Sequence, residues 1–199
     1  MTYGRAMHGM YAPVRTVAPA SEPVSLAEAK AHLRELSDDF DTLISALIGA
    51  ATEHLDGWSG VLGRALVTQT WVQSFDAFAE RLRLPMPAAS VVSVVYVDED
   101  GQDQTLATEN YVLRHDALGS YVELAFEAEW PTARDQKQAV TITFTCGSDA
   151  SAVPAPIKAA ILLLVGHLFE NRDAVSPDNL TTVPMAVDAL TAPYRKRVL

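Results

Sequence analysis

The chain has 199 residues, of which 49% are hydrophobic, and its 25 acidic and 15 basic side chains give a formal net charge of -10. This apolar content excludes disorder throughout and is large enough to bury a core. The acidic surplus disfavours a surface that wraps a nucleic-acid backbone. Because Cys146 is the single cysteine, an intramolecular disulfide and an all-cysteine metal site are excluded, and assembly in a reducing cytoplasm fits.

Residues 1–22 are predicted to form an extended N-terminal arm. Pro13, Pro19 and Pro23 prevent a continuous helix, and the segment lacks the apolar run of a secretion signal. We therefore expect an arm that is either mobile or ordered by a partner.

Two helices are predicted next. Ser25 and Glu28 have the spacing of a capping box, in which each side chain accepts from the other residue's backbone amide. The short oxygen-bearing side chains of Ser37, Asp38 and Asp39 suit the start of the second helix. Apolar residues then follow at helical spacing from Leu43 to Leu55. Together the two helices form an αα-hairpin that should pack against a third helix.

From Ala65 the apolar period changes to two, which predicts strands. The clearest alternation places Val140, Ile142 and Phe144 inward against outward threonines, and Asp98 to Gly101 is a turn signal. The predicted strands lie within 67–75, 81–84, 90–97, 105–106, 111–113, 121–124 and 140–145. They indicate a small antiparallel sheet, sandwich or barrel-like, inserted between helices.

A third helix is predicted in the segment from Val153 to Val175, and it is apolar on more than one face. Its apolar run is shorter than the ~20 residues that span a bilayer, so a buried soluble helix is favoured. One apolar stripe can pack on the hairpin, which leaves the other for a neighbouring copy. The residues predicted to form a subunit interface are Ile157, Ile161, Leu162, Leu164, Val165, Leu168 and Phe169.

The chain ends in a short helix and a basic segment. Pro184 can open a helix over Met185 to Leu190, and the last six residues are basic with an aromatic start. This segment is either a docking strand for an acidic partner or a frayed terminus. The predicted class is α+β, a helical bundle carrying an inserted antiparallel sheet. Its predicted parts are the arm 1–22, a helical core of 23–63 plus 152–193, a β domain of 64–151 and a tail of 194–199.

The order of several motifs resembles the head–tail connector, or adaptor, family of long-tailed phages and gene transfer agents. The similarity covers nearly the whole chain, and the order and spacing are more specific than any one motif. The matching segments are Pro23 to Arg34, Asp41 to Ala51, Gly63 to Trp71, Leu84-Pro85, Val91 to Gly101, Asn110-Tyr111, Val153 to Lys158, Leu162 to Leu164, Glu170 to Arg172 and Ala192 to Arg195.

This resemblance implies a non-enzymatic ring component of the particle neck, usually of twelve copies, assembled in the bacterial cytoplasm. The implied partners are a portal protein, a stopper or tail-terminator protein, other copies of the chain, and DNA only in passage; no membrane is implied. The implied portal contact consists of Tyr194, Arg195, Lys196 and Arg197. An acidic channel wall would let DNA slide, and the acidic cluster Asp38, Asp39 and Asp41 is one candidate for such a wall.

The sequence offers few residues for catalysis or ligand binding. The five histidines show no i, i+4 metal pair, Ser59 lacks the spacing of a nucleophile elbow, and Cys146 has no base beside it in sequence. Neither a cofactor nor a metal is expected. The alternatives are a β domain that binds a ligand or glycan of a virion and a small hydrolase. The first would use Trp71, Tyr96, Tyr111 and Tyr121; the second would use His54 or His115.

Overall fold

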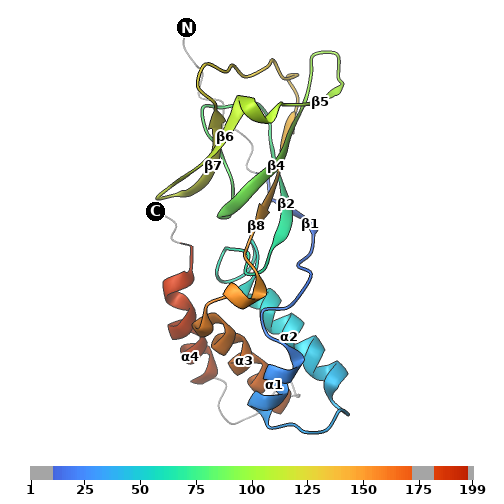
Figure 1. Ribbon diagram of the computed structural model, residues 1–199, viewed down its shortest axis with the longest axis vertical. Helices are drawn as coiled ribbons and strands as arrows, with labels where there is room; N and C mark the ends of the chain where they lie inside the picture. The colour runs from blue at the N-terminus through green and yellow to red at the C-terminus, as the bar shows by residue number, and fades with distance from the viewer. Residues whose placement is uncertain (1–10, 172–181, 197–199) are drawn as a thin grey trace. The chain divides into compact units, whose positions relative to one another are not determined.

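The computed structural model describes residues 11–171 and 182–196, which divide into two compact units (Figure 1). The helical unit consists of residues 19–68, 147–171 and 182–196. The β unit consists of residues 11–18 and 69–146. Four helices and two antiparallel sheets confirm the predicted α+β class with a small inserted sheet.

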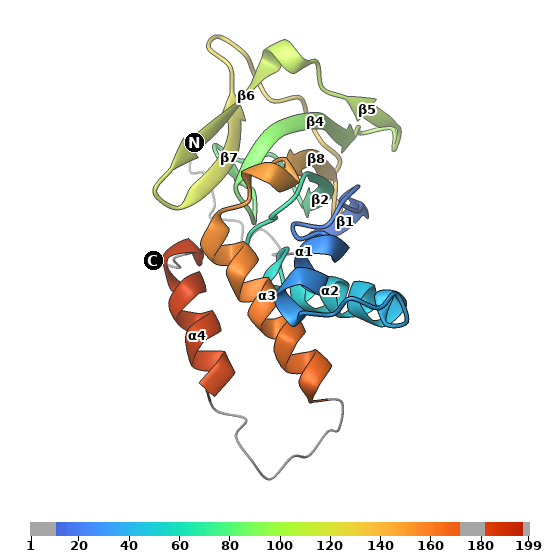
Figure 2. The same cartoon turned by 60° about the horizontal axis from the view of Figure 1, so that its bottom comes forward.

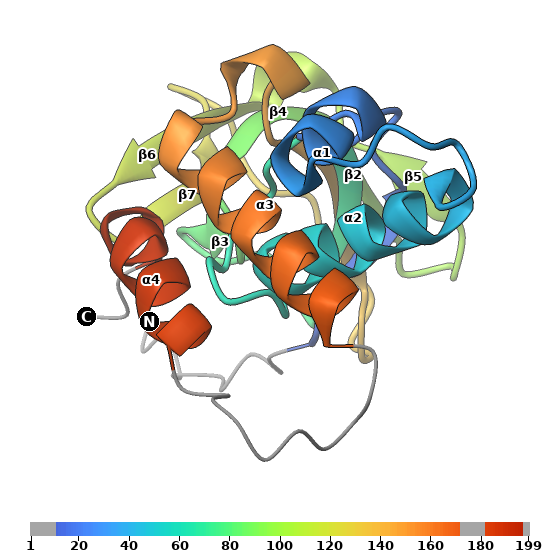
Figure 3. The same ribbon diagram turned by 90° about the horizontal axis from the view of Figure 1, so that it is seen from below.

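The helical unit is arranged around one central helix. In order, its helices are α1 (Leu26–Leu33), α2 (Asp41–Leu55), α3 (Ala155–Glu170) and α4 (Thr182–Thr191), with short 3-10 turns at Ala150–Ala152 and Ala192–Tyr194. Helix α3 contacts α1, α2 and α4. Figure 3 shows α3 between α4 on one side and the α1–α2 pair on the other.

The start of α1 is the predicted capping box. The Ser25 hydroxyl accepts from the Glu28 N–H at 3.2 Å, and the Glu28 carboxylate accepts from the Ser25 N–H at 2.7 Å. The hydrogen bonds from Ser25 lower the pKa of Glu28. The helix ends at Arg34, whose φ of 57° is left-handed.

The start of α2 differs from the prediction. Its N-cap is Phe40, and no side chain caps it, so the capping role assigned to Ser37, Asp38 and Asp39 is wrong. Asp38 instead forms an ion pair with Lys30 of α1. The Lys30 Nζ lies 2.6 Å from the Asp38 carboxylate and 2.7 Å from the Asp41 carboxylate. An ion pair across the hairpin has thus replaced a local cap.

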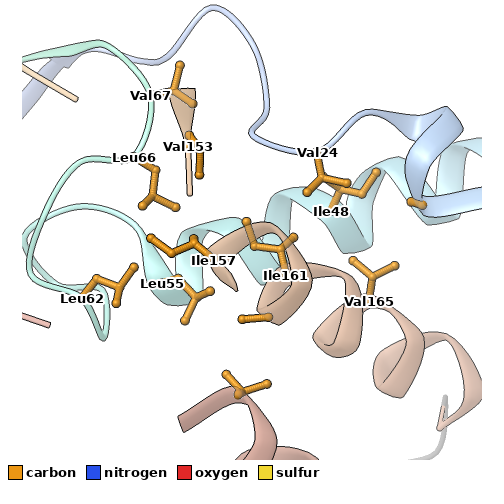
Figure 4. Close-up of a cluster of buried hydrophobic side chains, with 14 of the residues drawn as sticks. Val24, Ile48, Leu55, Leu62, Leu66, Val67, Val153, Ile157, Ile161 and Val165 are labelled. Carbon is orange, nitrogen blue, oxygen red and sulfur yellow. The ribbon is translucent and has the colours of Figure 1, made fainter. Parts of the chain in front are cut away.

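The core of the helical unit combines both parts of its chain. Figure 4 shows side chains of α2, α3 and the connecting loops converging. Its fully buried aliphatic residues include Ile44, Leu55, Leu62, Ile157 and Ile161. Burying one such side chain contributes about 1.5–3 kcal/mol, so this cluster holds the sequence-distant halves together.

The β unit contains one five-stranded and one three-stranded sheet. The first has the order β1-β2-β8-β4-β5, formed by Val14–Val17, Gln69–Phe75, Val140–Cys146, Ala88–Val97 and Asp103–Thr105. The second has the order β3-β7-β6, formed by Leu82–Arg83, Gly119–Leu124 and Tyr111–Asp116. Ser120 of the second sheet accepts hydrogen bonds from the N–H groups of Leu84 and Ala88, both at 2.9 Å.

Local patterns predicted much of this unit. In β8, Val140, Ile142 and Phe144 are buried and the threonines between them are not, as the alternation predicted. The turn after β4 is also confirmed, since Asp98 accepts from the N–H groups of Asp100 and Gln102, and Gly101 has a φ of +81°.

The N-terminal arm is partly a strand of the β unit. Residues Val14–Val17 pair with β2, and the Tyr11 hydroxyl donates to Asp76 at 2.6 Å. This bond raises the pKa of Tyr11, because the carboxylate stabilises the protonated phenol. The expectation that the arm is mobile or ordered by a partner is therefore wrong for residues 11–17. Residues 1–10 lie outside the described part of the chain.

Candidate assembly surfaces

Helix α3 carries the side chains that were predicted to contact a neighbouring copy. Ile157, Ile161 and Val165 are each at most 1% exposed, and they pack in the core of their own helical unit. No second copy could reach these three side chains without unfolding that core. Any subunit contact made by α3 must therefore use its other residues.

The remaining predicted interface residues are only partly free. Leu162, Leu164 and Phe169 are half-buried against the same core, and the Phe169 ring meets Phe40 edge-on at 5.6 Å. Leu168 is 37% exposed. The helix is apolar on several faces because α1, α2 and α4 of its own chain contact it. The apolar pattern of α3 consequently gives no independent argument for a ring.

The C-terminal segment folds back onto the helical unit. The Thr191 hydroxyl donates to the Val187 carbonyl at 2.8 Å, and Tyr194 packs against the core. The backbone N–H of Lys196 donates to the Leu62 carbonyl at 2.9 Å. The predicted docking tail is thus anchored as far as residue 196.

Within this segment the basic side chains differ in their surroundings. Arg195 forms an ion pair with Asp188 of α4, while its Nε is buried without a hydrogen-bond partner. Lys196 is half-buried. Arg197, the fourth residue of the implied portal contact, lies outside the described part of the chain. The surface that the segment offers is therefore formed by Arg195 and Lys196 beside α4.

The acidic cluster considered for a channel wall is partly neutralised. Lys30 binds two of its three carboxylates, those of Asp38 and Asp41, and this pairing lowers the pKa of Asp38 and raises that of Lys30. The Asp39 carboxylate accepts from the Ser37 hydroxyl at 2.6 Å.

The candidate catalytic residues His54, His115 and Ser59 do not form one active site. His54 lies exposed at the end of α2, whereas nearby Asp56 is 7% exposed and accepts from the Leu66 N–H at 2.6 Å. His115 Nδ1 lies 2.9 Å from the Ser120 hydroxyl, and Ser59 is exposed in a turn. The role of Asp56 was missed, because its partner lies ten residues away with no periodic signal.

Neither Cys146 nor a cluster of metal ligands offers a chemical site in the described ranges. The Cys146 thiol is fully buried, and its Sγ lies 3.9 Å from the Gln69 carbonyl. Within residues 11–171 and 182–196, no three acidic, histidine or cysteine side chains gather in a way that could hold a metal ion.

The aromatic residues of the ligand-binding alternative do not line one surface. Trp71 is buried and donates from its indole nitrogen to Gln69 Oε1 at 3.0 Å. Tyr111 is buried too, and this burial raises its pKa. Tyr96 packs against Phe78, and Tyr121 lies beneath two arginines. These side chains are packing elements, as strand aromatics usually are.

Comparison with solved structures finds chains similar to this one, among them the following three. One comes from the "virion of native gene transfer agent (GTA) particle", with 25% identity, a TM-score of 0.73, and coverage of 94% of this chain and 97% of that one. A second comes from the "neck of empty GTA particle computed with C6 symmetry", with 24% identity, a TM-score of 0.74, and coverage of 95% and 98%. A third comes from the "neck of native GTA particle computed with C12 symmetry", with 25% identity, a TM-score of 0.62, and coverage of 92% and 97%.

No protein-family model and no curated protein matches the chain. In the described ranges no helix is long and apolar enough to cross a lipid bilayer. The chain thus shares its fold, over nearly its whole length, with chains of the GTA virion and of the GTA particle neck.

Proposed function

We propose that this chain is a head–tail connector subunit that forms a ring in the neck of a phage-like DNA-delivery particle. The ring would lie between the portal and the stopper or tail, contain twelve copies, and extend the channel through which DNA passes. The observation that carries this proposal is the match to a chain of a GTA neck with C12 symmetry, which covers 92% of this chain. A structural role without catalysis follows from the same similarity.

The C-terminal segment is the proposed portal contact. Arg195 and Lys196 are basic on a chain of net charge -10, and they lie at the end of a segment that the helical unit holds in place. A held segment loses little conformational entropy on docking, which favours binding. Leu168 of α3 remains available for a neighbouring copy.

The test is co-sedimentation of the full chain with assembled portal rings, with the bound copies counted per portal. We expect about twelve copies, following the symmetry of the similar neck. Absence of binding at micromolar concentrations would overturn the proposal.

The role of the basic segment needs variants that keep the fold. Arg195→Glu removes a basic side chain but also breaks the ion pair with Asp188, whereas the double variant D188R/R195E restores an ion pair with its charges exchanged. If portal binding uses the positive charge at position 195, both variants lose binding while the double variant keeps its melting temperature. Wild-type binding by the double variant would refute this placement.

A further inference from the structure

The three-stranded sheet of the β unit presents a row of arginines that the chain's acidic composition does not suggest. Arg83 of β3, Tyr121 of β7 and Arg114 of β6 are register partners, so their side chains lie in one row on one face of the sheet. Arg81 lies just before β3, and its guanidinium is 5.0 Å from the centre of the Tyr121 ring. We call Arg81, Arg83, Tyr121 and Arg114 the arginine face.

The arginine face is held in position by its own contacts. Arg83 donates from Nη1 and Nη2 to the two Asp116 carboxylate oxygens, at 3.0 and 2.7 Å, and its guanidinium carbon lies 5.4 Å from the Tyr121 ring centre. Arg114 pairs with Glu123 at 3.1 Å. Stacking on an aromatic ring orients a guanidinium, so less entropy is lost when it meets a partner.

This face retains unused positive charge. Among residues 11–171 and 182–196, its three guanidinium groups have two carboxylates, Asp116 and Glu123, as partners. Arg81 comes only within 3.8 Å of Asp116, beyond hydrogen-bond distance, and its side chain is 48% exposed. Its donors therefore remain available to a carboxylate from another molecule.

A complementary surface lies elsewhere on the same β unit. The β4–β5 connection and the start of β5 carry Asp98, Glu99, Asp100 and Asp103, and Arg134 is the cation beside this turn. Asp98 is occupied by the turn's own amides and by Gln104, whereas Glu99, Asp100 and Asp103 are exposed. Figures 1 and 2 show β5 on the opposite side of the β unit from β6 and β7.

We infer that the arginine face binds the acidic β4–β5 turn of a second copy, so that successive β units join head to tail. This inference rests on the proposed ring. Two different, complementary surfaces on opposite sides of one unit are what a heterologous contact requires, and such contacts close into rings when the rotation allows. Charge complementarity of this kind sets the orientation and the rate of association.

Charge reversal on each side, and then on both, tests the inference with the full chain. R81E/R114E reverses the charge of two residues of the arginine face and leaves Arg83 unchanged. E99K/D100K reverses the charge of two residues of the acidic turn and leaves Asp98 unchanged. Each double variant places like charges opposite each other, and we expect its self-association constant at 50 mM salt to fall roughly tenfold or more. The chain carrying all four substitutions restores complementarity and should return to within about threefold of wild type.

Self-association is measured by sedimentation velocity over a concentration series at 50 and 500 mM salt. The matched controls are R34E/K137E and E109K/E129K, which reverse exposed charges outside both surfaces. They should self-associate like wild type. A second measurement uses the variant L118C/Q102C, which keeps every charged side chain of both surfaces and places one exposed cysteine beside each. Oxidation should give a ladder of cross-linked copies, because the native Cys146 is buried and does not compete.

Three results would overturn the inference: no cross-linked ladder, one-sided variants that associate like wild type, or a four-substitution chain that is not restored. If R81E/R114E instead changes retention of duplex DNA and leaves self-association unaltered, the arginine face is a phosphate contact and the inference is wrong. The proposed neck function stands separately if the same variants still bind the portal with the wild-type stoichiometry.

Discussion

At the residue scale, a polar side chain at the end of a helix accepts a hydrogen bond from the backbone of a later loop in the helical unit. That side chain is Asp56, whose buried carboxylate accepts from the Leu66 N–H after the chain has left α2. A buried donor that loses its acceptor costs its full desolvation penalty. Asp56 is therefore a structural residue, although it neighbours the histidine that was considered for catalysis.

We predict that Asp56→Ala lowers the free energy of unfolding by about 1–3 kcal/mol, because the buried Leu66 N–H loses its acceptor. Chemical denaturation followed by circular dichroism measures this change. Asp56→Asn keeps an acceptor oxygen and should lose less. Equal losses for the two variants would show that the charge, and not the hydrogen bond, matters.

At the element scale, strand β3 is only two residues long, and its attachment involves an ion pair as well as its pairing with β7. The Arg83 guanidinium lowers the pKa of Asp116 to about 2. Because this value lies below the ordinary value of 3.8, the charged carboxylate stabilises the fold above about pH 4 and loses this effect as the pH falls toward 2.

Wild-type protein should consequently lose more stability between pH 5 and pH 2 than Asp116→Asn, which has no charge to titrate at this position. Denaturation midpoints across this range measure the difference. Carboxyl chemical shifts should also place the Asp116 midpoint near 2 in wild type and nearer its ordinary value in Arg83→Gln. Parallel pH profiles for wild type and Asp116→Asn would contradict the assignment.

The burial of α3 gives a prediction at the same scale. Ile161→Ala should cost about 2–5 kcal/mol, because it leaves a cavity in a core that is closed within one chain. Leu168→Ala is the matched control and should cost clearly less, since Leu168 is 37% exposed. Both are measured on monomeric protein at low concentration. Similar small losses would mean that α3 is not buried until copies assemble.

The elements also show which sequence signals were sufficient. The capping box of Ser25 and Glu28, the turn at Gly101 and the alternation in β8 all involve residues within a few positions of each other, and all are confirmed. Helix α2 does begin directly after the predicted start signal, at Asp41, but its side-chain cap was predicted wrongly, because Lys30, eight residues before Asp38, competes for the Asp38 carboxylate. A capping pattern spans only a few residues, so it does not include Lys30.

At the scale of the whole molecule, the acidic surplus of a chain with net charge -10 bears on its behaviour toward DNA. Such a surface repels phosphate, apart from local exceptions such as the arginine face. The proposed role, a subunit that lines a channel without holding the DNA, needs this property.

Duplex DNA should accordingly not be retained by the free protein at 150 mM salt, because few cations are available to release counterions. Electrophoretic mobility shift with a duplex of random sequence measures this binding. The dissociation constant should exceed about 100 µM, the upper end of the range for non-specific DNA binding. A basic DNA-binding protein serves as the positive control. Retention at low micromolar protein would contradict a channel that DNA passes freely.

The sequence by itself determined the α+β class and the periods of its helices and strands, because periodicity, capping and turn chemistry act within a few residues. It also predicted that α3 would be buried. The predicted packing of the α1–α2 hairpin on α3 is confirmed, whereas only the tertiary structure decided that α4 of the same chain also contacts α3, because that contact depends on how the chain folds back after α3. Sequence patterns also did not predict the arginine face, because its residues come together only through the pairing of β3, β7 and β6. Side-chain contacts of this kind follow from the packing of whole elements, which no short stretch of sequence encodes.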